Sequence, residues 1–145
     1  MRLPHIERII VATDFSEGSD AALEHAVTLA RALNASVNIV HVLDPTWVAT
    51  GDADADAHAE RVDHALETRA QRLSSLGVIC QTDSLEGHPP TEIARHAEKV
   101  GAGMVVVGTR RHRGIGHVLL GSVAERVAQH ARCPVLAVPA REGTS

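Results

Sequence analysis

Short aliphatic runs alternate with longer amphipathic segments along the whole chain. The first run covers residues 8–13 and is followed by Asp14 and by Ser16, a residue type that caps helices. Apolar residues then recur at helical spacing as far as Asn34, a residue type that ends helices. A second aliphatic run over 36–43 stops at the Asp-Pro pair 44–45. The chain therefore opens with a predicted strand, helix and strand.

The same alternation continues to the C-terminus. The segment 56–76 carries an apolar stripe and ends at Gly77, as a helix ends before a capping glycine. The run 78–85 is more polar than the other predicted strands, which favours a place at a sheet edge. A turn is expected over 87–90, and a loop rich in glycine and arginine over 108–120. The remaining predicted elements are helices over 91–100 and 122–130 and strands over 103–107 and 134–138.

Regular alternation of strands and helices indicates an α/β fold, with a parallel sheet, right-handed crossovers and helices on both faces. Hydrophobic residues make up 44% of the 145 residues, and Phe15 and Trp47 are the only aromatic ones. Aliphatic side chains must therefore build the core, as in parallel sheets buried on both faces. We expect one domain over 1–145, with 141–145 as a flexible tail.

Charge and cysteine content narrow the classes of function. The formal net charge is −4 with histidine neutral, which disfavours a nucleic-acid-binding surface. Cys80 and Cys133 form no CxxC motif, and we expect them to be buried free thiols. The first residues do not resemble a signal peptide and no segment has the length of a membrane span, so a cytoplasmic protein is expected.

Open parallel sheets bind ligands beyond the carboxyl ends of their strands. The residues expected there are the pairs 13–14, 87–88 and 108–109 and the segment 41–44. The segment 108–122 is the most informative, because Gly108 permits a close backbone approach and Gly121-Ser122 marks a helix start that favours an anion. It is neither a P-loop nor a GxGxxG motif. Spacing alone leaves two interpretations open, a phosphate site and an ordinary solvated loop.

Other candidate sites are weaker. Six residues fall on the ligand spacing of a calcium loop, but Ala57 stands where that loop needs glycine, and Asp63 where it needs glutamate. A solvated helix start is the favoured interpretation. Those six are Asp52, Asp54, Asp56, His58, Glu60 and Asp63. The ten histidines form no metal motif, although His88, His112 and His117 are candidates for phosphate contact.

Four segments resemble the universal stress protein family. They are 10–16 (IVATDFS), 41–44 (HVLD), 121–127 (GSVAERV) and 133–138 (CPVLAV). The resemblance covers nearly the whole chain and is most specific in its C-terminal third. It implies an open, doubly wound five-stranded parallel sheet of order 3-2-1-4-5 with two helices on each face. It also implies a homodimer, joined through the last strand, Pro134 to Val138.

The nucleotide-binding branch of that family carries a glycine, two residues, a glycine, nine residues, and then Gly-Ser or Gly-Thr. Gly108 fills the first position, and Gly121-Ser122 fills the last after an intact spacer. Arg111 replaces the second glycine. A position that needs positive φ would make Arg111 unfavourable, whereas one that does not would let its guanidinium pair with a phosphate.

The resemblance implies binding of ATP or another adenine nucleotide, with Mg²⁺ accompanying the phosphates. Asp14 would accept a hydrogen bond from the adenosine, or would only organise its turn. Val42 would meet adenine through its backbone, or serve only as a core residue. The expected nucleotide-binding residues are Ala12, Thr13, Asp14, Val42, Val107, Gly108, Thr109, Arg111, Gly121, Ser122 and Val123.

The sequence is also compatible with two other functions. The first is a dimeric interaction module that has lost the nucleotide site, for which Arg111 is the signal. The second is a slow ATPase or self-phosphorylating protein, for which the sequence offers no dedicated base beyond Asp14 or a histidine of the loop. Ser16 and Ser122 are expected to act as helix caps rather than as nucleophiles.

Overall fold

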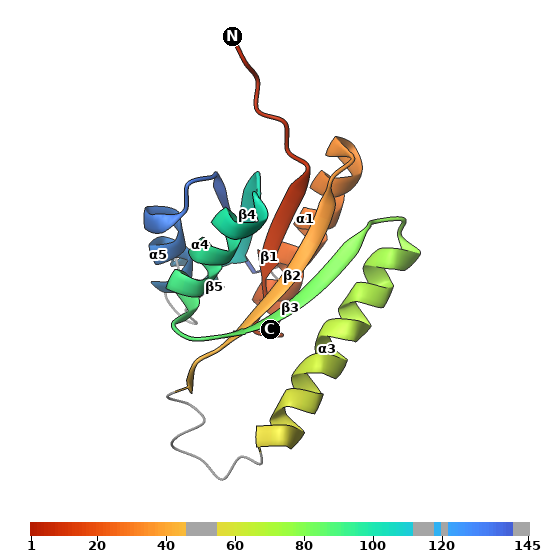
Figure 1. The fold of residues 1–145 in the computed structure, drawn as a ribbon, viewed down its shortest axis with the longest axis vertical. Coiled ribbons are helices and arrows are strands. Elements are labelled where there is room, and N and C mark those ends of the chain that lie inside the picture. The colour runs from red at the N-terminus through yellow and green to blue at the C-terminus, as the bar shows by residue number, and fades with distance from the viewer. Residues whose placement is uncertain (46–54, 112–117, 120–121, 141–145) are drawn as a thin grey trace.

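The computed structural model describes residues 1–45, 55–111, 118–119 and 122–140. Five parallel strands form one sheet in the order β3-β2-β1-β4-β7, which confirms the predicted order (Figure 1). The strands are β1 (Arg8–Ala12), β2 (Ser36–Leu43), β3 (Cys80–Glu86), β4 (Met104–Gly108) and β7 (Val135–Val138). The helices are α1 (Glu17–Leu33), α3 (Ala55–Ser75), α4 (Pro89–Val100) and α5 (Ser122–His130).

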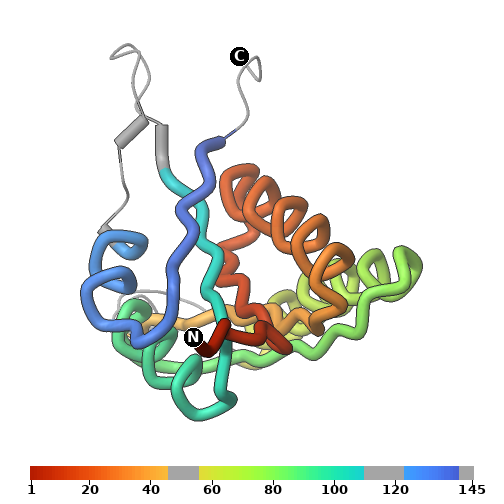
Figure 2. Tube along the Cα trace, turned by 90° about the horizontal axis from the view of Figure 1, so that it is seen from above, coloured from red at the N-terminus to blue at the C-terminus, as the bar shows by residue number. Residues whose placement is uncertain are grey.

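Helices cover both faces of the sheet, as the alternating pattern predicts. Figure 2 shows α1 and α3 on one side and α4 and α5 on the other. Ile9 and Val11 point into the α1–α3 side, whereas Ile10 between them points into the α4–α5 side. All three side chains are fully buried, because a strand covered on both faces exposes neither. The polar edge strand predicted over 78–85 is β3.

The first helix begins and ends where its sequence signals predict. The Ser16 side chain accepts a hydrogen bond from the backbone N–H of Ser19, and Asn34 closes the helix in the left-handed conformation. The third predicted helix starts earlier than expected, at Pro89 rather than Thr91. Prolines fit the first turn of a helix, whose N–H groups have no intrahelical acceptor, so the Pro-Pro pair belongs to α4 and not to the preceding turn.

The glycine- and arginine-rich segment also differs from the prediction of an uninterrupted loop. Arg110–Arg111 (β5) pairs antiparallel with Val118–Leu119 (β6). Two-residue strands carry no periodicity, which is why the hydrophobic pattern does not indicate them. The backbone of Arg111 is therefore part of a short ladder.

A polar trio lies within the α4–α5 side of the sheet. His96 on α4 places its Nε2 atom 2.8 Å from Oδ1 of Asn38 on β2 and 3.3 Å from Oδ2 of Asp83 on β3. The Asn38 amide donates to the same Asp83 oxygen at 3.0 Å. Asn38 and His96 are buried, and burial of polar groups is tolerated when they hydrogen-bond to one another. The trio joins α4 to the β2–β3 pair.

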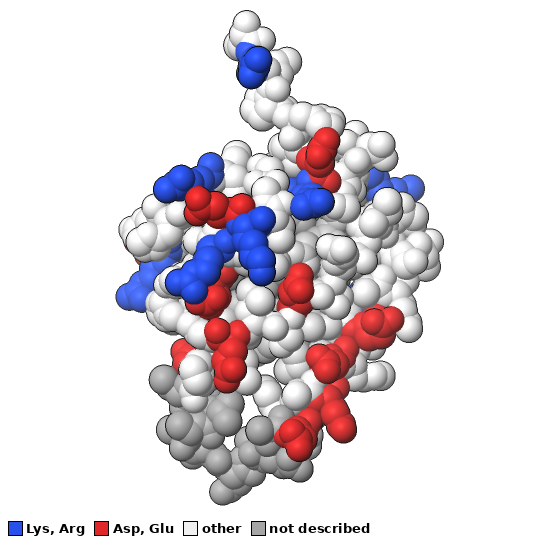
Figure 3. Space-filling view, in the orientation of Figure 1, with Lys and Arg blue, Asp and Glu red and all other residues white. Residues whose placement is uncertain are grey.

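Two surface findings complete the fold. Within the described ranges, no helix is both long enough and apolar enough to cross a membrane. Acidic side chains follow one exposed face of α3 at positions 56, 60, 63 and 67, and Figure 3 shows a row of acidic side chains on the α3 side of the molecule. The helical spacing of these four positions fits a solvated face.

Candidate functional site

The carboxyl ends of β1, β2 and β4 lie side by side, because β1 pairs with β2 on one side and with β4 on the other. We call this the carboxyl edge of the sheet. The Thr13 N–H donates to the Val40 carbonyl at 2.9 Å, which continues the β1–β2 pairing one residue beyond β1. The predicted site residues on these strands and just after them therefore share one edge. They are Ala12, Thr13, Asp14, Val42, Val107, Gly108 and Thr109.

The remaining predicted residues belong to the segment that leads into α5. Ser122 begins α5 and Val123 lies in its first turn, partly exposed. The backbone of Arg111 is described as part of β5, whereas Gly121 lies outside the described residues. His112 and His117 lie outside them as well.

Gly108 ends β4 against the first turn of α1. A Cβ atom added to Gly108 would lie 2.5 Å from the Gly18 carbonyl oxygen and 3.1 Å from the Ser19 nitrogen. The strand end and the helix start thus touch backbone to backbone. From the sequence, Gly108 is expected to permit the close approach of a ligand, and no pattern indicates a role for Gly18. In the structure, Gly108 allows the close approach of a helix.

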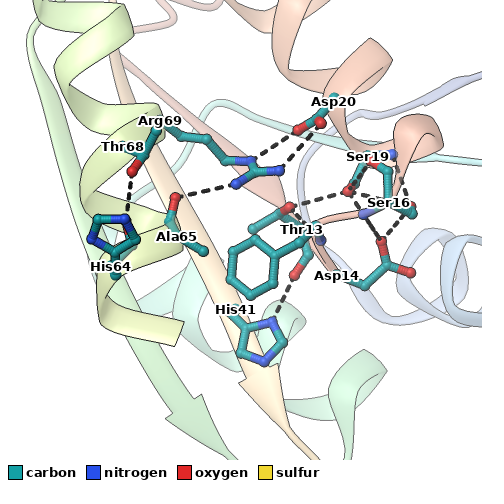
Figure 4. A network of polar contacts seen from close by, with 11 residues as sticks. Thr13, Asp14, Ser16, Ser19, Asp20, His41, His64, Ala65, Thr68 and Arg69 are labelled. Carbon is teal, nitrogen blue, oxygen red and sulfur yellow. Dashed lines mark hydrogen bonds and ion pairs between the residues drawn. The ribbon is translucent and has the colours of Figure 1, made fainter. Parts of the chain in front are cut away.

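A network of hydroxyl groups surrounds the exposed Asp14 (Figure 4). Its Oδ1 atom accepts from the Ser16 N–H and from the Ser19 hydroxyl, each at 3.0 Å, and contacts the Ser16 hydroxyl. Ser19 also lies 3.0 Å from the buried Thr13 hydroxyl, which accepts from the Phe15 N–H. Asp14 therefore organises the turn after β1, and its carboxylate is at the same time exposed at the carboxyl edge.

Phe15 has a backbone conformation that is unusual for an aromatic residue. Its φ is 66°, in the left-handed region, which costs a residue with a Cβ roughly 1–2 kcal/mol. Its ring stacks on the imidazole of His41, with centroids 4.7 Å apart and planes inclined by 27°. The Arg69 guanidinium carbon lies 5.0 Å from the centroid of the same ring. These contacts favour the conformation that the backbone alone disfavours.

Arg69 joins α3 to α1 next to this ring. Its Nε atom donates to Asp20 Oδ1 at 2.9 Å, and its Nη2 atom donates to Asp20 Oδ2 at 3.2 Å. Nη1 donates to the Ala65 carbonyl within α3. This bidentate geometry is the strong form of an arginine–carboxylate pair. No local sequence pattern indicates Arg69, because its partner lies 49 residues away along the chain.

His41 anchors the turn from the other side. Its Nδ1 atom lies 2.8 Å from the Thr13 carbonyl oxygen. A carbonyl oxygen can only accept, so Nδ1 carries the hydrogen. The sequence identifies His41 only as part of a segment at a strand end.

The α5 side of the carboxyl edge is built differently. His88, just before α4, places its Nε2 atom 3.3 Å from Nη1 of Arg126 on α5, and both side chains are exposed. The first N–H groups of any helix have no intrahelical acceptor, which makes the start of α5 a place where an anion is favoured. Thr109 is buried, and both its N–H and its hydroxyl donate to the Val138 carbonyl.

The weaker candidates gain no support. Asp52 and Asp54 of the possible calcium loop lie outside the described residues, and the described ranges contain no group of three or more potential metal ligands.

The two cysteines are free and only partly buried. Burial, followed by the negative charge of Glu67, raises the pKa of Cys80 to about 11. Burial also raises the pKa of Cys133. Both thiols lie near the beginnings of strands, away from the carboxyl edge.

Comparison with known proteins identifies the fold and the family. This chain is 36% identical over 138 residues to the universal stress protein MJ0531 of Methanocaldococcus jannaschii, covering 91% of this chain and 81% of the relative. The solved structure of the hypothetical protein MJ0577 matches with a TM-score of 0.80 at 25% identity, covering 97% of this chain and 100% of the other.

A universal stress protein solved in complex with cAMP matches with a TM-score of 0.71 at 25% identity, over 95% of this chain and 100% of the other. The sequence pattern that defines the universal stress protein family matches residues 5–139, which is most of the chain. The chain therefore belongs to the universal stress protein family.

Proposed function

We propose that this chain is a cytoplasmic stress-response regulatory protein that binds ATP or another adenine nucleotide at the carboxyl edge. One observation carries the proposal. The exposed carboxylate of Asp14, the end of β2 and the end of β4 share one edge, in an open parallel sheet of the kind that binds ligands there. A relative with the same fold was solved with cAMP, which is itself an adenine nucleotide.

The residues present fit such a ligand. Asp14 accepts a hydrogen bond from the adenosine, the Val42 backbone contacts the base, and Val107 and Gly108 line the ribose and base. Ala12, Thr13 and Thr109 complete the edge. Gly121, Ser122 and Val123 meet the phosphates through N–H groups at the start of α5. Mg²⁺ would accompany the phosphates and neutralise part of their charge.

Arg111 decides how strongly the phosphates are held. Its backbone belongs to the β5–β6 ladder, an extended conformation that suits any residue with a side chain. In this proposal the Arg111 guanidinium pairs with a phosphate and takes the place of the second motif glycine.

A second function, a dimeric interaction module without nucleotide, is favoured by a separate observation. β7 is an edge strand, and Leu136 on it is 36% exposed. Edge strands offer unpaired backbone groups to another chain. A homodimer through Pro134 to Val138 is compatible with either function.

Calorimetric titration with ATP and with AMP, in the presence of Mg²⁺, tests the first function. We expect saturable heat with ATP, weakened about tenfold or more by Asp14→Ala through loss of a charge-assisted hydrogen bond. Asp63→Ala, on the exposed face of α3, is the matched control and should leave binding unchanged. Arg111→Gly should weaken ATP more than AMP, because AMP has fewer phosphates to pair.

Absence of both heat and thermal stabilisation at millimolar ATP would reject the nucleotide site in favour of the interaction module. A large gain in affinity in Arg111→Gly would show instead that the native segment hinders binding.

A further inference from the structure

The second ring nitrogen of His41 is positioned to accept a hydrogen bond from a ligand. Nδ1 donates to the Thr13 carbonyl, so Nε2 of the neutral ring carries a lone pair and acts as an acceptor. In the described part of the chain, Nε2 makes no hydrogen bond. Figure 4 shows that this nitrogen points away from Thr13.

The surrounding contacts fix the plane of the imidazole. One face of the ring stacks on Phe15, with centroids 4.7 Å apart and planes inclined by 27°. Arg69 lies over the Phe15 ring and is itself held by Asp20. His41 also sits on a central strand rather than on a loop. Preorganisation of this kind is typical of groups that select a ligand.

The position of His41 along the carboxyl edge indicates which part of a nucleotide it would meet. β2 lies two places from β4 in the sheet, and neighbouring strands are about 4.8 Å apart, so the two strand ends are about 10 Å apart. A nucleotide with its phosphates at the start of α5 and its ribose near β4 and β1 brings its base to β2. The group that selects the base is thus expected on β2.

We infer that Nε2 of His41 accepts a hydrogen bond from the 6-amino group of adenine, and that His41 thereby selects 6-aminopurine nucleotides over 6-oxopurine nucleotides. This inference rests on the proposed function. A 6-oxopurine presents a carbonyl oxygen at that position. Two acceptors would then face each other with no hydrogen between them, and a site built around a hydrogen bond rejects such an analogue.

The test combines variants of the protein with analogues of the ligand. Affinities of ATP, N6,N6-dimethyl-ATP and ITP are measured for the native protein and for His41→Phe, which keeps a ring for the Phe15 stack but has no acceptor. We expect the native protein to bind ATP about tenfold or more tightly than either analogue. In His41→Phe the three affinities should converge. The control, His64→Phe on the exposed face of α3, should keep the native ratios.

The outcomes separate the inference from the proposed function. If His41→Phe weakens all three ligands by the same factor, His41 has only a structural role and the inference is wrong, while nucleotide binding stands. If the native protein binds none of the three, both the proposed function and the inference fail.

A measurement on the native protein covers the case in which His41→Phe does not fold. The ¹⁵N resonance of His41 Nε2 should shift on addition of ATP, as the nitrogen becomes hydrogen-bonded, and not on addition of N6,N6-dimethyl-ATP. Equal responses to the two ligands would overturn the inference.

Discussion

The amino edge and the carboxyl edge of the sheet, which are the two ends of its strands, differ in how residues with positive φ are stabilised. At the amino edge, where the strands begin, positive φ occurs at Asn34, Gly77 and Gly101, which follow the ends of helices. These residue types adopt that conformation at little cost. At the carboxyl edge Gly87 after β3 also has positive φ, but there the aromatic Phe15 adopts the left-handed conformation as well, supported by His41 and Arg69.

The difference shows where side chains determine the backbone. Helix caps at the amino edge need only the right residue at one position. The turn after β1 at the carboxyl edge needs partners from β2, α1 and α3 together. Strain that several elements support is a mark of functional sites. Variants at the carboxyl edge should therefore have larger effects than their counterparts at the amino edge.

The largest effect is expected for Gly108→Ala. The added Cβ would lie 2.5 Å from the Gly18 carbonyl oxygen, so β4 and α1 must separate. We expect the free energy of unfolding to fall by about 2–3 kcal/mol, as overpacking does elsewhere, with loss of ATP affinity. Urea denaturation measures the first effect. Gly77→Ala at the amino edge meets no atom within 4 Å and should cost only about 1 kcal/mol. Equal costs for the two variants would break the comparison.

Arg69→Met comes next. The variant removes the bidentate pair with Asp20 and the cation over Phe15, while it keeps most of the apolar stem. We expect a loss of roughly 1–2 kcal/mol in thermal or urea unfolding. The control is Arg72→Met, at an exposed position one turn further along α3, which should change stability by less than about 0.5 kcal/mol. Similar losses for both arginines would show that the Phe15 turn does not depend on α3.

Ser19→Ala should have a smaller effect. It deletes the hydroxyl that contacts both Asp14 and Thr13, so about 1 kcal/mol is expected from the lost hydrogen bond. ATP binding should weaken with it, because Asp14 is less well oriented. Ser75→Ala, which removes an exposed hydrogen bond at the end of α3, should cost a few tenths of a kcal/mol at most. A Ser19→Ala protein of native stability would indicate that the hydroxyl network is dispensable.

The last effect concerns reactivity, and the variant tested there changes it only a few-fold. With its pKa raised from 9.0 to about 11, Cys80 has about a hundredth of the ordinary thiolate fraction at pH 8, and alkylation by iodoacetamide should be correspondingly slow. Glu67→Gln removes the smaller cause of the shift and should raise the rate only a few-fold. Alkylation as fast as in the denatured chain would show that burial does not protect this thiol.

Most of the fold could be predicted because its signals are local. The strand over 36–43 and the limits of α1 follow directly from aliphatic runs and cap residues. The pattern places the start of α4 two residues late, because the Pro-Pro pair has the composition of a turn. The β5–β6 ladder cannot be predicted in this way, because strands of two residues leave no periodic pattern.

Much less of the carboxyl edge could be predicted from the sequence. Asp14 and Gly108 each follow an aliphatic run, so the hydrophobic pattern predicts that they lie at the carboxyl edge. The backbone contact between Gly108 and Gly18 and the arginine pair of Asp20 join segments far apart in sequence. Such contacts depend on three-dimensional packing, which a single sequence does not reveal.

The polar trio beneath α4 has a consequence for how this fold can diverge. Replacing Asn38 alone leaves the buried His96 nitrogen without its partner at 2.8 Å, and replacing His96 alone leaves the Asn38 carbonyl in the same condition. Exchange of both for aliphatic residues of similar volume is far less costly. The two positions should therefore change together among descendants of this sequence, so that an asparagine on β2 is inherited with a histidine on α4.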